Sequence, residues 1–154
     1  MTTSINTDTG AYGFDDRNIN WYKLGDFEHF VYAMLDIDED KLIVDAILKF
    51  EHDEQIFLHR HMAETNTLVI QGEHRLYDPD GKLKEVRPVG TYTSSPPDPD
   101  PHREGGGAEG AVVVYNIRSN QETIFEILDD ELNVVGTLGM QDFIAVYKEQ
   151  KNAA

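Results

Sequence analysis

The segment Phe57-Leu58-His59-Arg60-His61-Met62-Ala63-Glu64-Thr65-Asn66 contains two histidines separated by a single residue. Residues 55–61 have the composition of a β-strand, in which alternate side chains project from the same face. Strand spacing places the Cα atoms of His59 and His61 about 6–7 Å apart, so that both imidazoles could reach one metal ion. A short H-x-H pattern also occurs on exposed strands that are merely polar. The pair alone therefore leaves a metal site and a polar surface open.

The remainder of the chain is a succession of short strand-like runs. These runs are rich in Val, Ile, Leu, Phe and Tyr and are separated by turn residues, which is typical of a β-sandwich or barrel. The expected strands are Phe30–Leu35, Leu42–Phe50, Gln55–His61, Asn66–Ile70, His74–Tyr77, Gly90–Ser94, Ala111–Ile117, Thr123–Leu128 and Asn133–Thr137.

The closing segment has the period of a helix. Met140, Phe143, Ile144 and Tyr147 fall on one face of a short amphipathic helix. We expect this helix to lie across the barrel or its edge. The pattern as a whole predicts an all-β domain with a short C-terminal helix.

Length and composition predict one domain without disulfide or thiolate chemistry. The 154 residues suit a single domain. Residues 1–20 contain too few apolar side chains to pack independently, so we expect a flexible lead-in there and one domain over residues 21–154. Because the chain has no cysteine, a metal must be held by histidine, carboxylate or water.

The charge of the chain limits its partners. A formal net charge of −16 argues against binding to nucleic acid, whose phosphates would be repelled. The sequence contains no recognisable signal peptide and no apolar run of roughly 18 residues, so we expect a cytoplasmic protein without a membrane partner. Small barrels often pair through exposed edge strands, which predicts a homodimer or homotetramer.

A third histidine is presented by an unusual segment. His102 follows the proline-rich run 96–101, and prolines stiffen the backbone that precedes a side chain. The glycine-rich segment Arg103–Gly110 comes next and is expected to be a surface loop or a lid over the site. The other histidines, His29, His52 and His74, lack spaced partners, and we interpret them as ordinary surface or capped residues.

These segments together resemble the two conserved motifs of the cupin superfamily. Residues 57–72 resemble the first motif, an H-x-H followed by a strand and a glycine, and residues 90–102 resemble the second, which ends in the third histidine. The resemblance extends from about Trp21 to Tyr147. It is closest to small three-histidine cupins such as acetylacetone dioxygenase and 2,4'-dihydroxyacetophenone dioxygenase, and the cupin domain of ChrR-type anti-sigma factors is similar too.

The resemblance implies a small double-stranded β-helix, or jelly-roll, barrel with a metal held by His59, His61 and His102. Many cupins add a ligating glutamate after the H-x-H motif, but the corresponding position here is Asn66, a poor ligand, and Glu64 lies two residues early. We therefore expect three neutral histidines without a carboxylate and regard Glu64 as a minor alternative. Alternate side chains of a strand share a face, and counting along the chain from Thr67 and Val69 places Arg75 and Tyr77 on the side of the same cavity. We therefore regard Arg75 and Tyr77 as candidate catalytic residues.

A three-imidazole site suits an anionic chelating substrate. The ion keeps its full charge and has open positions for a two-oxygen ligand and for dioxygen. The resemblance implies an Fe2+-dependent dioxygenase that uses O2 to cleave a C–C bond in a small dicarbonyl or hydroxyketone. Imidazole also accepts Zn2+ and Ni2+, so a zinc-holding sensor or binding module and a metal-dependent lyase or isomerase remain as alternatives.

Overall fold

The computed structural model describes residues 13–98 and 100–153. The elements in chain order are β1 (Phe30–Asp38), β2 (Ile43–Phe50), β3 (His59–His61), β4 (Glu64–Tyr77), β5 (Leu83–Pro88), β6 (Tyr92–Ser95), β7 (Arg103–Arg118), β8 (Thr123–Leu128), β9 (Val134–Gly139) and α1 (Met140–Ala153).

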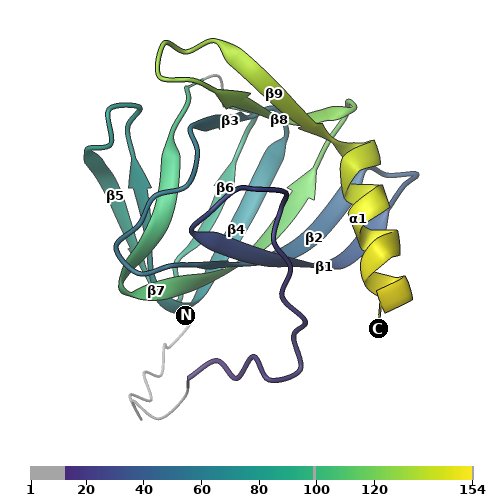
Figure 1. Ribbon diagram of the computed structural model, residues 1–154, viewed down its shortest axis with the longest axis horizontal. Coiled ribbons are helices and arrows are strands. Elements are labelled where there is room, and N and C mark those ends of the chain that lie inside the picture. The colour runs from purple at the N-terminus through teal and green to yellow at the C-terminus, as the bar shows by residue number, and fades with distance from the viewer. Residues whose placement is uncertain (1–12, 99, 154) are drawn as a thin grey trace, which may run out of the picture.

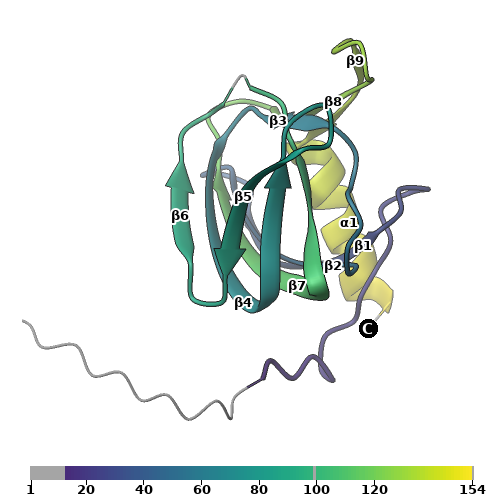
Figure 2. The ribbon, with the colours of Figure 1, turned by 90° about the vertical axis from the view of Figure 1, so that its left-hand side faces the viewer.

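The strands form two antiparallel sheets. The larger sheet has the order β1-β2-β7-β4-β5, with β6 paired to a second stretch of β4, and the smaller sheet has the order β3-β8-β9. The smaller sheet lies at the top of the view in Figure 1, and helix α1 follows β9 down one side of the larger sheet. Figure 2 shows the same two layers from the side. The predicted all-β domain with a short C-terminal helix is confirmed.

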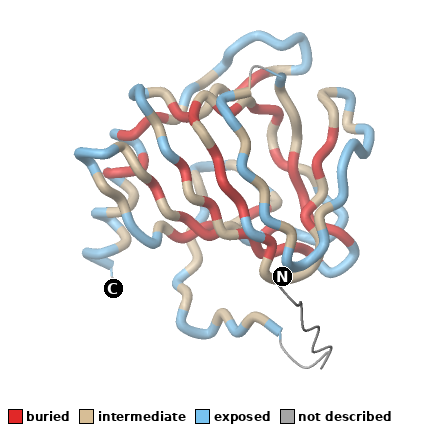
Figure 3. Tube along the Cα trace, turned by 180° about the vertical axis from the view of Figure 1, so that it is seen from behind, coloured by how far each residue is buried: buried red, intermediate tan, exposed pale blue. Residues whose placement is uncertain are grey.

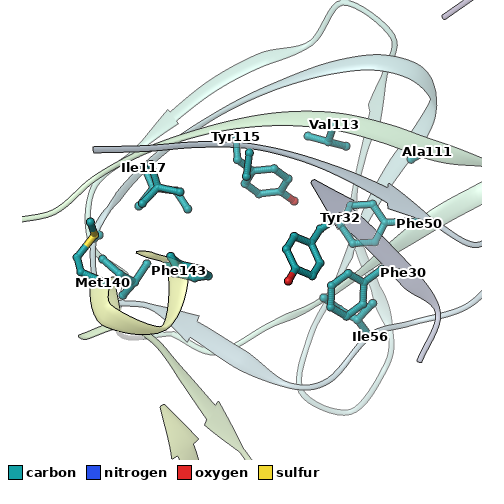
Figure 4. Close-up of a cluster of buried hydrophobic side chains, with 14 of the residues drawn as sticks. Phe30, Tyr32, Phe50, Ile56, Ala111, Val113, Tyr115, Ile117, Met140 and Phe143 are labelled. Atoms are coloured by element: carbon teal, nitrogen blue, oxygen red, sulfur yellow. The ribbon is translucent and has the colours of Figure 1, made fainter. Parts of the chain in front are cut away.

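The core lies between the sheets and the helix. Buried and more exposed positions alternate along many of the strands, as expected when one face of a sheet packs inward (Figure 3). Aromatic rings from both ends of the chain meet there, among them Phe30, Tyr32, Tyr115 and Phe143 (Figure 4). Full burial of a side chain of this size stabilises the fold by about 1.5–3 kcal/mol.

The prediction of a surface loop or lid at Arg103–Gly110 is wrong, because these residues begin the long strand β7. Glycine is required there by close approach of other backbone segments. A Cβ atom on Gly105 would collide with the carbonyl of Glu54, and one on Gly106 would collide with the backbone of Gly110. The glycines thus allow tight packing within a strand.

Strand β4 joins two strands that the sequence predicts separately. Its pairing with β7 shifts between Val69 and Gln71 and again between Gly72 and His74, and Gly72 has a φ of 69°. Such bulges insert extra residues and change which side chains face inward. Odd-numbered Thr67 and Val69 are buried before the bulges, and His74 is buried after them.

Part of the predicted lead-in lies within the described residues. Phe14 donates its backbone N–H to the side chain of Gln71, and Asp16 pairs with Lys49 at 2.7 Å. Phe14 also packs on a small apolar cluster that is separate from the main core. Residues 1–12 lie outside the described part of the chain. Among the described residues, no helix combines the length and the apolar character needed to cross a membrane.

Candidate metal centre

Four side chains converge between the two sheets. His59, His61, His102 and Glu104 each offer one ligand atom, and all of these atoms lie within 4.8 Å of one another. The three histidines that the sequence predicts as ligands are thus brought together. The structure adds a carboxylate, Glu104, that the sequence analysis did not predict.

Two short segments of extended chain position this group. His59 and His61 alternate along β3, so both side chains leave the same face. The backbone N–H of each of His59 and His102 donates to the carbonyl of the other, at 3.1 and 2.9 Å. Glu104 stands two residues after His102 and therefore shares its face. An H-x-H pair and an H-x-E pair consequently lie side by side.

The distances within the group are short. Glu104 Oε2 lies 2.7 Å from His59 Nε2, 3.7 Å from His61 Nε2 and 3.5 Å from His102 Nε2. The Nε2 atoms of His61 and His102 are 3.2 Å apart. His59, His61 and Glu104 are buried, and His102 is only slightly exposed.

Hydrogen bonds on the far side of two rings determine which nitrogens are unprotonated. His59 Nδ1 donates to the carbonyl of Phe57 at 2.9 Å. His61 Nδ1 lies 3.0 Å from the hydroxyl oxygen of Thr65, which itself donates to the carbonyl of Ala63 and so accepts from the imidazole. In the neutral rings, each Nε2 therefore carries a lone pair.

The convergence of lone pairs fits a cation. Two Nε2 lone pairs and the Glu104 carboxylate point into the same small volume, where electron pairs repel one another unless a positive charge lies between them. Imidazole nitrogens and a carboxylate oxygen are ligands that first-row divalent metals accept. The hydrogen bonds from the Nδ1 atoms are the partners that usually orient metal-binding histidines. The donor set and its surroundings thus fit a metal ion.

His61 and Glu104 are both in the protonation state in which they can bind a metal. Desolvation lowers the pKa of His61 to about 4, so this imidazole is neutral at pH 7. Burial alone would raise the pKa of Glu104, but its contacts with the surrounding side chains outweigh burial and hold that pKa well below its usual value. The carboxylate is therefore ionised.

The second oxygen of Glu104 has partners of its own. Tyr115 donates its hydroxyl to Oε1 at 2.6 Å, and His74 Nε2 lies 2.9 Å from the same atom. Burial and the negative charge of Glu104 raise the pKa of Tyr115 well above 10, so its hydroxyl keeps its proton. The interpretation of His74 as an ordinary surface or capped residue is wrong, because His74 is completely buried and contacts Glu104.

A largely apolar cavity opens on one side of the group. The space in it that is open to the centres of water-sized molecules is about 70 Å³, and one side opens to solvent. His59, His61, Glu104 and Tyr115 contribute the polar groups at one end, and the remaining wall is almost entirely hydrocarbon. Phe125 belongs to this wall and stands edge-on to His61 with 4.9 Å between ring centroids.

A second, more polar cavity lies on the other side. His61, His102 and Glu104 line it too, together with side chains of β4, β5 and β6 such as Thr67, Arg87 and Thr93. Arg87 is held there by Glu85 at 2.9 Å. The four-residue group thus separates an apolar space from a polar one.

The structure does not bring Arg75 and Tyr77 to the group. Arg75 pairs with Glu73 at 2.6 Å and with Asp53 at 3.2 Å, and neither it nor Tyr77 lines the two cavities. The bulges of β4 explain the difference, because they turn His74 rather than Arg75 inward. The expectation that both residues face the cavity is therefore not met.

The two residues after the H-x-H motif that the sequence analysis considered as further ligands have other surroundings. Neither Glu64 nor Asn66 belongs to the four-residue group. Asn66 hydrogen-bonds Asn116 on the neighbouring strand. A usable signal for Glu104 was nevertheless present, because His102-Arg103-Glu104 repeats the spacing of His59-Arg60-His61. Alternate residues of a strand share a face, so recognising residues 103–110 as a strand would have placed Glu104 on the same side as His102.

Comparison with known proteins supports the fold. No family model and no curated protein sequence matches the chain. Among solved structures, an RmlC-like cupin protein from Ralstonia eutropha matches 88% of this chain with 83% of its own, at a TM-score of 0.71 and 16% identity. An acetylacetone dioxygenase from Acinetobacter johnsonii matches 97% of this chain with 99% of its own, at a TM-score of 0.70 and 10% identity. The chain therefore has the cupin fold that its motifs predict.

Other structures with this architecture act differently. A DMSP lyase from Ruegeria pomeroyi matches 69% of this chain with 59% of its own, at a TM-score of 0.53 and 17% identity. Identities at this level establish the shared fold alone. The reaction has to be argued from the site.

Proposed function

We propose that this cupin-fold chain is a metal-dependent, non-haem dioxygenase that cleaves a C–C bond in a small dicarbonyl or hydroxyketone. The metal would be Fe2+, held by His59, His61, His102 and Glu104. The observation that carries the proposal is that this four-residue group borders an almost wholly apolar cavity, which His59, His61 and Glu104 line.

The side chains of the chain have three tasks in this proposal. The three imidazoles and Glu104 would bind the ion, and Phe125 packs edge-on against the His61 ring and helps to hold that ring in place. The hydrocarbon wall of the cavity excludes water and accepts the alkyl or aryl groups of a ketone. When bound, the ion would supply Lewis acidity that favours the enolate of the substrate and, as Fe2+, the redox chemistry that dioxygen requires.

Glu104 changes the expected electronics of the site. A carboxylate ligand lowers the net charge of the metal group relative to three neutral imidazoles. On a six-coordinate ion, four protein ligands also leave two positions for other ligands instead of three. A substrate that chelates through two oxygens would fill both positions, so dioxygen would have to reach the substrate through the cavity instead of having a position of its own on the ion.

A second candidate is a lyase or isomerase that uses Zn2+ or Ni2+ without dioxygen. The same donors accept these ions, and a lyase is found among the structures that share this fold. A third candidate, a zinc-holding sensor or binding module, would use four ligands as a closed tetrahedral site. The cavity that reaches the ligand atoms favours an enzyme over this third candidate, because a structural zinc site needs no such space.

Metal analysis combined with oxygen uptake distinguishes these candidates. Protein purified without chelators would be analysed for metal and then supplied with pentane-2,4-dione and aryl hydroxyketones in an oxygen electrode. Iron together with substrate-dependent oxygen uptake is the expected result. Substrate loss without oxygen uptake would point to the second candidate, and zinc without turnover of any carbonyl compound would point to the third.

A matched variant shows whether uptake depends on the site. His102→Ala should abolish oxygen uptake, because it removes one ligand. His52→Ala should leave it unchanged, because the side chain of His52 is 76% exposed and lies outside the group. Equal uptake by both variants would contradict the proposal.

A further inference from the structure

The two oxygens of Glu104 face different surroundings. Oε2 faces the imidazoles, 2.7 Å from His59 Nε2. Oε1 points away from them and receives hydrogen bonds from Tyr115 and His74. The carboxylate therefore has one oxygen hydrogen-bonded to Tyr115 and His74 and one oxygen directed at the candidate metal centre.

Both donors are themselves held in place. His74 belongs to β4, has no exposed surface and stacks on Phe50 with 5.3 Å between ring centroids. Tyr115 belongs to the central strand β7 and is 3% exposed. Because both side chains are buried and belong to strands of the larger sheet, that sheet determines the direction from which Glu104 is held.

The donor roles follow from chemistry. The phenol of Tyr115 can only donate to an ionised carboxylate. His74 has one ring nitrogen at Glu104, whereas its buried Nδ1 has no hydrogen-bond partner among the described residues. Because an ionised carboxylate can only accept, the Nε2 of His74 bears the hydrogen that is donated to Glu104. A buried ring nitrogen without a partner is unfavourable, so the contact with Glu104 is the polar interaction that accounts for a histidine at this position.

We propose that Tyr115 and His74 are positioning residues that hold Glu104 in a single orientation, with Oε1 occupied and Oε2 alone presented to a metal. The inference rests on the metal-binding part of the proposed function. Without these donors, Oε1 could also turn toward the ion, or the carboxylate could leave it. Tyr115 and His74 would thus determine how strongly, and through how many oxygens, Glu104 binds.

Metal affinity is the direct test. Zn2+ binding would be measured in competition with a chromophoric chelator for the wild type, Tyr115→Phe and His74→Leu. Each substitution should raise the Kd by about 10–100-fold, the usual cost of losing a residue that orients a ligand. His74→Gln, which keeps an N–H donor, should recover part of this loss. Tyr32→Phe serves as the matched control, since Tyr32 is a buried tyrosine of the same cavity, and its Kd should not change.

A double-mutant cycle separates positioning from general packing. If Tyr115 acts through Glu104, then Tyr115→Phe should change the Kd by less than about two-fold in a Glu104→Ala background. The same loss in both backgrounds would overturn the inference, because it would mean that Tyr115 supports the site by packing. Near-UV circular dichroism would verify folding, and Tyr115→Phe with His74→Gln still decides the question if His74→Leu does not fold.

Spectroscopy measures the ligand set directly, and a substitution that affected only packing would not change it. The visible bands of the Co2+-loaded protein report the ligand set and should change in Tyr115→Phe but not in Tyr32→Phe. A wild type that binds no metal would overturn the proposed function and this inference together. A wild type that binds metal, with Kd values and spectra of the variants unchanged, would overturn this inference alone.

Discussion

At His59, one hydrogen bond determines which ring nitrogen is available. Donation from Nδ1 to the carbonyl of Phe57 leaves Nε2 unprotonated and directed at Glu104. His61 is arranged in the same way through Thr65. These local contacts, rather than the mere presence of histidines, distinguish a ligand group from exposed polar residues.

The alternation of side chains along a strand was sufficient to predict part of the four-residue group. The side chains of His59 and His61 share a face because they are two residues apart, and His102 was predicted from its place after the proline-rich run and from the cupin resemblance. Glu104 was missed because its parity is informative only if residues 103–110 form a strand. Arg75 was expected inside because parity was extended across Gly72, where the structure has bulges.

The role of Glu104 as a ligand can be tested by comparison with Glu64, a carboxylate of the neighbouring strand β4. Glu104→Ala should weaken metal binding at least about ten-fold, since it removes a direct ligand as well as its orienting partners. Glu64→Ala should leave the Kd unchanged, because Glu64 lies outside the group. Isothermal titration with Zn2+ measures both. A larger effect of Glu64→Ala than of Glu104→Ala would contradict the assignment.

At the scale of the element, β7 links the core to the site. It supplies Glu104 at its start and Tyr115 near its end, and it pairs with both β2 and β4. Its glycines were interpreted as a loop because composition alone does not show which backbone segments approach them. That information is tertiary, and local sequence patterns do not contain it.

The packing of these glycines leads to a stability prediction. Gly105→Ala would force a Cβ atom against the carbonyl of Glu54, and overpacking of this kind lowers the free energy of unfolding by about 1–3 kcal/mol. Gly136→Ala is the matched control within a strand, since its Cβ would meet only the side chain of Ile127 at 3.9 Å. Urea denaturation should show a loss for Gly105→Ala and a change below about 1 kcal/mol for Gly136→Ala. Equal losses would mean that close backbone approach is not the reason for glycine at position 105.

For the whole molecule, the sequence was most informative about architecture. Alternating apolar runs and a closing amphipathic segment predicted an all-β domain with a terminal helix, because hydrophobic periodicity depends on which face of each element is buried. Strand boundaries, the merging of β4 and the pairing of β5 with β4 depend on contacts between distant segments. The motifs that predicted the cupin fold are those that form the site.

The arrangement of the two sheets gives the site its two sides. An apolar cavity and a polar cavity meet at His61, Glu104 and Tyr115, which line both. A ligand that enters the apolar side exchanges water for hydrocarbon contacts before it reaches the ligand atoms. This is the reason to expect a carbonyl compound with alkyl or aryl groups as substrate.

The most direct test of this account is the metal content of the wild type and of His102→Ala after dialysis against Fe2+ under anaerobic conditions. The account predicts close to one ion per wild-type chain. It also predicts the loss of most of that metal from a His102→Ala variant that remains a folded β protein by circular dichroism. A folded His102→Ala that keeps a full equivalent of metal would contradict the ligand set from which the proposed function is derived.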